Sequence, residues 1–330
     1  MKILIAGLGS IGRRHLQNLL ALGERDILLY RTHQSSLPEE ALHAFSTESD
    51  LSAALAYRPQ AVVISNPTAL HLAVAIPAAE AGCSILMEKP ISHSLQGVDE
   101  LKTALQKGGG RLLVGYHFRF HPVLQLAAKL LKEGTIGQPL SVRCQWGEYL
   151  PGWHPWEDFH QGYSARADLG GGVVLTLSHP LDYLRMLLGE VESLWAFTSS
   201  KGLELAVEDT AEIGLRFVNG VTGSLHLDYL QRPARHNLEI IGSQGSLRWD
   251  NQSGCLEVLG TDGETRQVQR PPAGFERNTL FVDEMRHFLA VARGEQSPAC
   301  SLRDGIQVLK LALAVLQSAR QGRLVKLEER

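Results

Sequence analysis

The sequence predicts an α/β protein with two domains: a doubly wound parallel sheet over residues 1–121, and an α+β domain with a large, open, mostly antiparallel sheet over residues 122–330. Two patterns indicate this fold. In the first third of the chain, short apolar runs alternate with helical stretches, as in successive βαβ units. After about residue 141, strand-like segments follow one another with only turns between most of them, as in an antiparallel meander.

Five strands are expected in the first domain. Each is a continuous apolar run rather than an alternating one, which is typical of parallel strands that helices cover on both faces. The runs span residues 2–6, 27–30, 61–65, 84–88 and 111–115, and a helix over 11–22 joins the first two.

The second domain is expected to form an open sheet that two helices follow. Its strands span residues 141–149, 191–198, 210–218, 222–230, 237–242 and 246–250. The helices cover residues 276–292 and 302–319, and a final apolar stretch covers 323–327. We expect a ligand in the crevice between the two domains, because open α/β sheets bind ligands beyond the carboxyl ends of their strands.

Composition excludes several classes of function. Charged residues make up 20% of the chain and the net charge is −3, without a Lys/Arg block, so no nucleic-acid partner is expected. No apolar run approaches the roughly 18 residues that span a membrane, and the N-terminal stretch is predicted to be a strand, not a signal peptide. The four cysteines form no C-x-x-C pair, which predicts reduced thiols in a cytoplasmic protein and no structural zinc.

The pattern G-x-G-x-x-G stands between the first predicted strand and the first predicted helix, where it is typical of a dinucleotide-binding Rossmann fold. Gly7 permits the tight turn, Gly9 lets the backbone approach a pyrophosphate, and Gly12 lets helix and strand pack closely. Ser10 and Ile11 open the helix, whose N–H groups and dipole face the anion. The alternative is a glycine turn without a ligand.

The position about 20 residues after the glycine pattern selects the cofactor in this fold, where a carboxylate binds the ribose 2′-hydroxyl of NAD. Here that position holds Arg31, followed by Thr32, and the next carboxylate is Glu39. A cation and a hydroxyl suit a 2′-phosphate, which predicts NADP as the preferred cofactor and NAD as the second. The alternative is that Arg31 stacks on adenine without selecting the phosphate.

Polar residues follow two strands at the edge where a ligand is expected. Asn66 and Pro67 follow the third predicted strand, and Glu88 and Lys89 stand at the end of the fourth. Pro90 fixes the backbone after Lys89, so that the ammonium is aimed toward the place of a nicotinamide. A surface lysine at a strand end is the alternative interpretation.

With these motifs, the sequence resembles the Gfo/Idh/MocA family of oxidoreductases, which includes glucose-fructose oxidoreductase and inositol dehydrogenase. The resemblance runs along nearly the whole chain, and Glu88-Lys89-Pro90 is its most specific element. The other elements are residues 7–12, 66–71, 115–122, 170–172 with His179, and 241–246.

The resemblance implies an NAD(P)-dependent dehydrogenase or reductase that acts on the CH–OH group of a sugar, a cyclic polyol or a related hydroxy or keto compound. It also implies a homodimer or homotetramer that associates through the sheet of the second domain. Lys89 matches the family's catalytic lysine. We assign to the cofactor site, beside the glycine turn and Arg31, the residues Asn66, Pro67, His71, Glu88 and Lys89.

This chemistry gives Lys89 a physical role. When hydride leaves an alcohol carbon, the hydroxyl proton must leave too, and the developing charge on oxygen needs a donor within about 3 Å. An ammonium supplies that donor and can hold the substrate over the nicotinamide, whereas the hydride chemistry belongs to the cofactor.

Thr176, His179, Asp182 and Tyr183 are predicted to share one face of a helix after the glycines at 170–172. We assign His179 as a catalytic proton relay that also contacts the substrate, because an imidazole titrates near working pH, and Thr176 as a substrate contact. The alternative is a core histidine that Asp182 satisfies.

One position departs from the family's pattern. Many members have an aspartate about one helical turn before the histidine, where this chain has Thr176. A threonine cannot act as a carboxylate base. Either His179 works with Lys89 alone, oriented by Asp182, or the site has lost the usual alcohol oxidation.

The segment over residues 150–163 concentrates aromatic and polar side chains, as do loops that line sugar sites. Trp153 and Trp156 are therefore assigned to the substrate, with loop anchoring or a subunit contact as the equal alternative. Arg119 is a further substrate candidate that could instead contact the adjacent domain. The histidines of this segment lack a third ligand at a recognised spacing, so no metal is expected.

The leading hypothesis is an NAD(P)-dependent sugar or polyol oxidoreductase. A cofactor-bound sensor or regulator without turnover is a second hypothesis, because similar folds host binding-only proteins. A third is a reductase of a keto sugar-nucleotide, which a positive surface near the substrate would favour.

Overall fold

The computed structural model describes residues 1–31 and 42–327, and these form two compact units. The N-terminal unit comprises Met1–His117 and Glu276–Leu309, and the C-terminal unit comprises Phe118–Phe275 and Lys310–Arg330. The predicted functional division after residue 121 stays a prediction. Its single boundary did not anticipate that residues 276–309 return to the N-terminal unit, because apolar helix periodicity does not say which sheet a helix covers.

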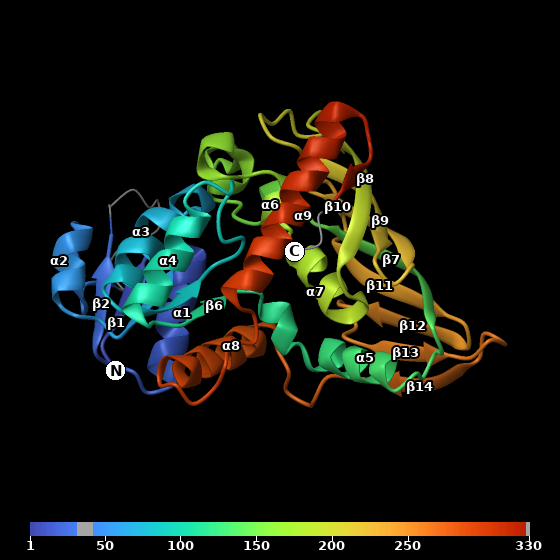
Figure 1. Cartoon of the computed structure of the whole chain (residues 1–330), viewed down its shortest axis with the longest axis horizontal. Helices are drawn as coiled ribbons and strands as arrows, with labels where there is room; N and C mark the ends of the chain where they lie inside the picture. Colours follow the sequence, from blue (N-terminus) through green and yellow to red (C-terminus); the bar gives the residue numbers. More distant parts are fainter. Residues whose placement is uncertain (32–41, 328–330) are drawn as a thin grey trace. The chain divides into compact units, whose positions relative to one another are not determined.

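The N-terminal unit is built on a parallel sheet with the strand order β3-β2-β1-β4-β5-β6 (Figure 1). Neighbouring strands pair in register, as in Ile5 with Leu29 and with Val63. This is the order of a doubly wound dinucleotide-binding sheet, so the predicted fold class is confirmed for this unit. The strands are β1 Ile3–Ala6, β2 Ile27–Tyr30, β3 Ser46–Glu48, β4 Ala61–Ile64, β5 Ser84–Met87 and β6 Leu112–Val114.

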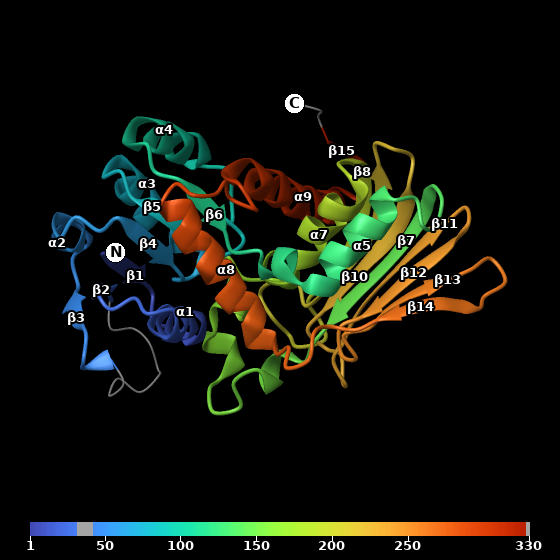
Figure 2. The same cartoon turned by 90° about the horizontal axis from the view of Figure 1, so that it is seen from below.

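Helices cover both faces of this sheet (Figure 2). Helix α3 packs with α4 on one face, and α1 packs with α8 on the other. Apart from the edge strand β3, the strands between them are almost wholly buried, which explains their unbroken apolar sequences. The helices are α1 Ser10–Ala21, α2 Leu51–Ala56, α3 His71–Glu80, α4 Val98–Gly108 and α8 Arg277–Ala292, with the short 3₁₀ helix η2 Thr68–Leu70.

The C-terminal unit is built on a nine-stranded sheet with the order β14-β13-β12-β11-β7-β10-β9-β8-β15. Strands β7 and β10 pair in parallel and the other neighbours pair antiparallel, which confirms the predicted mostly antiparallel sheet. The strands are β7 Pro139–Gly147, β8 Val191–Ser199, β9 Thr210–Phe217, β10 Thr222–Asp228, β11 Arg235–Gly242, β12 Gly245–Asp250, β13 Leu256–Leu259, β14 Thr265–Gln269 and β15 Val325–Lys326.

Helices cover one face of the nine-stranded sheet and leave the other without a described helix (Figure 2). Along β9 the buried side chains alternate with polar ones, as a half-covered sheet requires. On β8 the uncovered face carries Trp195 and Phe197, which are 44% and 68% exposed. The helices are α5 Pro122–Lys132, α6 Val173–Thr176, α7 His179–Leu188 and α9 Leu302–Gln321, the last of which contains the division between the units.

The sequence analysis did not predict three of the described strands, β3, β13 and β14. Strand β3 is a short edge strand of polar residues, and β14 carries exposed side chains, so neither has an apolar signal. The short strand β13 stands between β12 and β14. Across the described part of the chain, no helix combines the length and apolarity that crossing a membrane requires.

Candidate cofactor and active site

The glycine turn lies directly against the end of β4. Gly7 follows β1 with a φ of +93°, and a Cβ there would lie 2.4 Å from the amide nitrogen of Asn66. A Cβ on Gly12 would lie 2.0 Å from the Gly7 carbonyl oxygen. The Ser65 hydroxyl donates a hydrogen bond of 2.9 Å to that carbonyl. The turn therefore has its tight form because neither glycine carries a side chain.

The start of α1 is shaped to hold an anion. The helix begins at Ser10, with Ile11 next and Gly9 as its N-cap, and the N-cap side receives no side-chain hydrogen bond. A Cβ on Gly9 would meet nothing within 4 Å, so the backbone is open to a ligand there. The first N–H groups of a helix have no intrahelical acceptor, and the helix dipole favours negative charge. This cradle fits the pyrophosphate of a dinucleotide.

A hollow of about 500 Å³ lies beside this helix start and is rich in arginine. Burial lowers the pKa of Arg14, and the nearby charge of Arg277 lowers it further. The Arg14 guanidinium lies 4.6 Å from the centre of the Phe281 ring. The hollow is lined by Ser10, Arg13, Arg14, Gln17, Glu276, Arg277 and Asn278.

Arg31 follows β2, as predicted for a residue that meets the adenosine half of the cofactor. It is 7% exposed, and its backbone N–H donates to the Glu48 carbonyl over 3.0 Å. Thr32 lies outside the described residues. The preference for NADP over NAD stays a prediction.

The loops after β4 and β5 carry the other predicted cofactor residues, and His71 bridges them. Its ring nitrogens lie 2.9 Å from the carbonyl oxygens of Asn66 and Pro90. Burial lowers the pKa of His71 to about 4, so the imidazole is neutral at physiological pH. Since a neutral ring donates from only one nitrogen, it serves one carbonyl at a time. Pro67 continues the first loop, and Lys89 the second.

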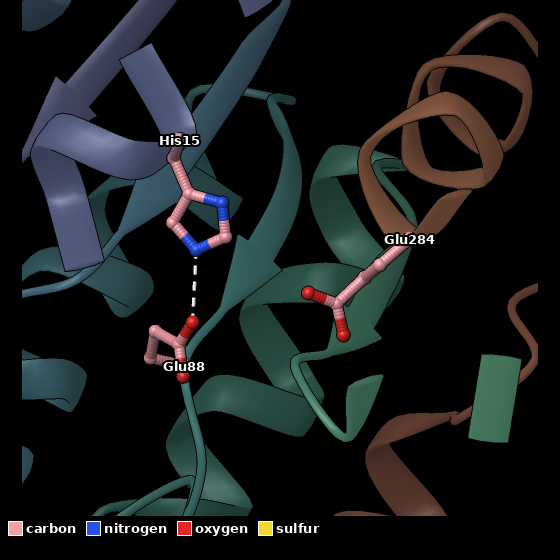
Figure 3. Close-up of side chains that lie close together, drawn as sticks. All are labelled: His15, Glu88 and Glu284. Carbon is pink, nitrogen blue, oxygen red and sulfur yellow. Dashed lines mark hydrogen bonds and ion pairs between the residues drawn. The ribbon is translucent and has the colours of Figure 1, made fainter. Parts of the chain in front are cut away.

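A buried cluster of His15, Glu88 and Glu284 lies under the second loop (Figure 3). The His15 Nε2–H donates to Glu88 over 2.8 Å, and the other Glu88 oxygen accepts the Lys89 backbone N–H over 3.3 Å. Burial favours the protonated form of Glu88, but the His15 hydrogen bond and the Lys89 charge hold its pKa below the ordinary value. The carboxylate of Glu88 therefore fixes the backbone of Lys89.

Glu284 faces this pair from α8, as Figure 3 shows. It is fully buried, and neither of its oxygens has a hydrogen-bond partner among the described residues. Burial raises the pKa of Glu284 well above its ordinary value, and the charge of Glu88 raises it further. Both causes favour the protonated, uncharged form of this side chain. Sequence reasoning missed it, although an acid within the apolar stripe of a helix was a signal.

His179 lies in the C-terminal unit, among aromatic rings. It is 2% exposed, and its ring centre lies 5.1 Å from that of Phe118 and 5.7 Å from that of Trp146. The predicted single helix through this region was wrong: α6 ends at Thr176 and α7 begins at His179. Pro180 sits in the first turn of α7, where proline starts a helix readily and cannot continue one.

Arg119 forms a two-pronged ion pair with Asp182 within the C-terminal unit. Its Nε and terminal nitrogen lie 2.8 and 2.7 Å from the two carboxylate oxygens. Asp182 is 1% exposed, so the guanidinium neutralises a buried charge. The role of Arg119 toward the substrate and that of Asp182 toward His179 stay predictions.

The two predicted substrate tryptophans have different surroundings. Trp153 packs edge-on against Tyr229, with ring centres 5.8 Å apart, whereas Trp156 is 69% exposed. The segment winds through short 3₁₀ turns, among them η4 Leu150–Gly152 and η6 Tyr163–Ala165. Of the predicted catalytic pair, Lys89 belongs to the N-terminal unit and His179 to the C-terminal unit.

Comparison with known proteins places these features in a family. Residues 1–116 match the model of an oxidoreductase family with an NAD-binding Rossmann fold, and residues 124–248 match that of the GFO/IDH/MocA C-terminal domain. The chain is 29% identical to D-apiose dehydrogenase of Paraburkholderia graminis, over 98% of this chain and 89% of the relative. It is 28% identical to myo-inositol 2-dehydrogenase of Thermotoga maritima, over 100% and 99%.

A solved structure shares the fold. Levoglucosan dehydrogenase in complex with NADH and levoglucosan superposes with a TM-score of 0.87, at 23% identity and with 100% of each chain covered. At 23% identity, this similarity shows a shared fold and nothing further.

The glycine turn yields a matched pair of variants. Gly12→Ala should lower the free energy of unfolding by about 1–3 kcal/mol, because its Cβ would meet backbone at 2.0 Å. Gly9→Ala should leave stability within about 0.5 kcal/mol yet weaken cofactor binding, since its Cβ enters the open cradle. Urea unfolding and NADH fluorescence titration measure the two effects. A Gly12→Ala protein as stable as wild type would contradict this packing.

Glu284→Gln should become more stable than wild type as pH rises. Because the pKa of Glu284 is raised in the folded protein, this residue favours folding at a pH below its ordinary pKa. That contribution is lost as the pH rises toward the pKa of the folded state. Glutamine does not titrate. Urea unfolding at about pH 5 and about pH 8 measures the difference. The half-exposed neighbour Asp283→Asn is the control, and a pH-independent difference for Glu284→Gln would contradict a neutral buried acid.

Proposed function

The chain belongs to the GFO/IDH/MocA family of NAD-binding oxidoreductases, and we propose that it interconverts an alcohol and a carbonyl on a sugar, cyclic polyol or related hydroxy or keto compound. The observation that carries this proposal is the position of Lys89. This residue follows β5, its backbone N–H is held by the Glu88 side chain, and it belongs to the unit that contains the glycine turn. The names of the relatives, which are sugar and polyol dehydrogenases, support the substrate class.

The proposed cofactor residues fit a dinucleotide. Gly7, Gly9 and Gly12, with Ser10 and Ile11, would hold the pyrophosphate at the start of α1. Asn66, Pro67, His71 and Glu88 would form the wall beyond β4 and β5. When bound, the nicotinamide supplies or accepts the hydride.

The proposed catalytic residues act on the substrate oxygen. The Lys89 ammonium polarises it and stabilises negative charge as the hydroxyl proton leaves. His179 relays that proton, and Thr176, Arg119, Trp153 and Trp156 contact the remaining hydroxyls and ring faces of the substrate.

A reductase of a keto sugar-nucleotide is a second candidate, because the arginine-rich hollow offers a positive surface beside the glycine turn. Arg14 and Arg277 also act on His117. Burial lowers the pKa of His117, and the positive charges of Arg277, Lys89 and Arg14 lower it further. The charges of Arg14, Arg277 and Lys89 therefore all act on His117.

We also propose a cytoplasmic homodimer or homotetramer. The exposed pair Trp195 and Phe197, on the uncovered face of the nine-stranded sheet, supports association through that face. Four free cysteines support a reducing compartment.

Lys89→Met should abolish turnover and retain cofactor binding, because it keeps the side-chain length and removes the ammonium. The test follows nicotinamide absorbance with NAD or NADP and a panel of polyols, sugars, sugar acids and keto sugar-nucleotides. A loss of at least about 100-fold is expected. If the wild-type protein binds the cofactor tightly but turns over no compound of the panel, the result would favour a sensor without turnover.

Arg31→Asp should shift the ratio of NADPH to NADH affinity toward NADH by at least about tenfold, because a carboxylate repels a 2′-phosphate and binds a 2′-hydroxyl. Fluorescence titration with each reduced cofactor measures the ratio. An unchanged ratio would leave Arg31 as a residue that does not select the phosphate.

A further inference from the structure

His15 lies on α1, the helix whose first turn forms the anion cradle, and its side chain is wholly buried. Its Nε2 lies 2.8 Å from Oε1 of Glu88 (Figure 3). Although burial raises the pKa of Glu88, its hydrogen bonds and the charge of Lys89 hold that pKa below the ordinary value. The carboxyl is therefore ionised and can only accept, so the ring nitrogen of His15 is the donor.

The Glu88 carboxylate passes this contact on to the backbone of Lys89. Its second oxygen accepts the Lys89 N–H over 3.3 Å, while the Glu88 N–H donates to the Ile64 carbonyl of β4 over 2.9 Å. A Cβ on Gly115 would lie 3.3 Å from Cα, Cδ and Oε2 of Glu88, so the absence of a side chain there leaves this carboxylate its place. One side chain thus joins α1 to the residue that follows β5.

The loop that carries Lys89 is also held from α3, where Nδ1 of His71 lies 2.9 Å from the Pro90 carbonyl oxygen. The two attachments differ in what else their helices do. Helix α1 begins at the cradle for the pyrophosphate, and the pyrophosphate is covalently joined to the nicotinamide ribose. The contact made by His15 therefore sets where Lys89 lies relative to the cofactor, within a single compact unit.

We propose that His15 is a positioning residue, which acts through Glu88 to tie the Lys89 backbone to the helix that holds the cofactor. This inference rests on the proposed function of Lys89. Hydride transfer needs the ammonium at the substrate oxygen while the reacting carbon faces the nicotinamide, so both distances must be right at once. Loss of the His15 donor should therefore impair turnover more than cofactor binding, because backbone groups of the glycine turn form the cradle.

Two polar substitutions at position 15 separate the hydrogen bond from the other properties of the ring. In His15→Gln the amide nitrogen can take the place of Nε2, whereas in His15→Asn, one methylene shorter, it takes the place of Nδ1. Asn18→Leu is the matched control for lost stability. Asn18 is buried on the same helix and accepts a hydrogen bond of 3.0 Å from Asn278 of α8, a contact that does not involve Glu88.

The first experiment measures kcat and KM with the substrate found in the panel, and the Kd of the reduced cofactor. His15→Asn should lower kcat by at least about 30-fold, because a misplacement of about 1 Å can cost about 100-fold. Its cofactor Kd should stay within about twofold of wild type. His15→Gln should keep kcat within about threefold, and Asn18→Leu should lower Tm without lowering kcat. Equal kcat values for His15→Gln and His15→Asn would overturn the proposal.

A double-mutant cycle tests whether His15 acts through Glu88. Residues that act through one another show losses that do not add, whereas independent residues show additive losses. The protein with both His15→Asn and Glu88→Gln should therefore lose about as much kcat as Glu88→Gln alone. Additive losses in the double variant would overturn the proposed route from His15 to Lys89.

The second experiment needs no turnover and so separates failure of this inference from failure of the proposed function. In protein labelled with ¹⁵N-lysine, the Lys89 amide signal is the one that Lys89→Met removes. Its exchange with D₂O should be at least about tenfold faster in His15→Asn than in wild type, and nearly unchanged in His15→Gln. Unchanged exchange in His15→Asn would overturn the proposal even if the protein turned over every substrate tested. Faster exchange in a protein that turns over no compound of the panel would support the link and count against the proposed function.

Discussion

The contact between the glycine turn and the end of β4 is the constraint on which the candidate cofactor site depends. Positions 7 and 12 have no space for a side chain, and the Ser65 hydroxyl closes the contact by donating to the Gly7 carbonyl. Because the turn cannot widen, α1 begins at a fixed place and its first N–H groups point in a fixed direction. An anion site made this way needs no charged side chain, although the arginine-rich hollow beside it adds positive charge.

Buried polar side chains extend this rigidity from β4 to the loop that carries Lys89. His71 spans the carbonyl groups of Asn66 and Pro90, and Glu88 links His15 to the Lys89 backbone. Polar groups in a dry interior are tolerated only when they are paired or neutral. His71 is neutral because burial lowers its pKa to about 4, and burial raises the pKa of Glu284, which favours its protonated form.

The C-terminal unit meets a different constraint, since the described helices cover its sheet on one face only. Against that face, aromatic rings and imidazoles pack together: Trp146 stacks on His236 with ring centres 4.3 Å apart, and the Tyr183 hydroxyl lies 3.0 Å from both His236 and Cys144. His179 sits among these rings, and Glu208 reaches the start of α6 from a neighbouring segment. The helices α6 and α7, which follow each other in the sequence, therefore have different surroundings: an acidic side chain at the start of α6 and aromatic rings around His179 on α7.

The sequence by itself determined the fold class, the glycine turn and the strand-end position of Lys89, because each depends on a local pattern: apolar runs, a G-x-G-x-x-G spacing, and residues adjacent in the chain. Tertiary structure alone decided the partners that come from far away. Glu284 meets Glu88 from a helix near the other end of the chain, Arg119 pairs with Asp182, and Glu208 packs on Gly172. The break between Thr176 and His179 also required the folded chain, because helical spacing continues across those residues while the backbone does not. Spacing rules describe neighbours along one element, whereas burial, pairing and the resulting pKa values arise only when distant elements pack together.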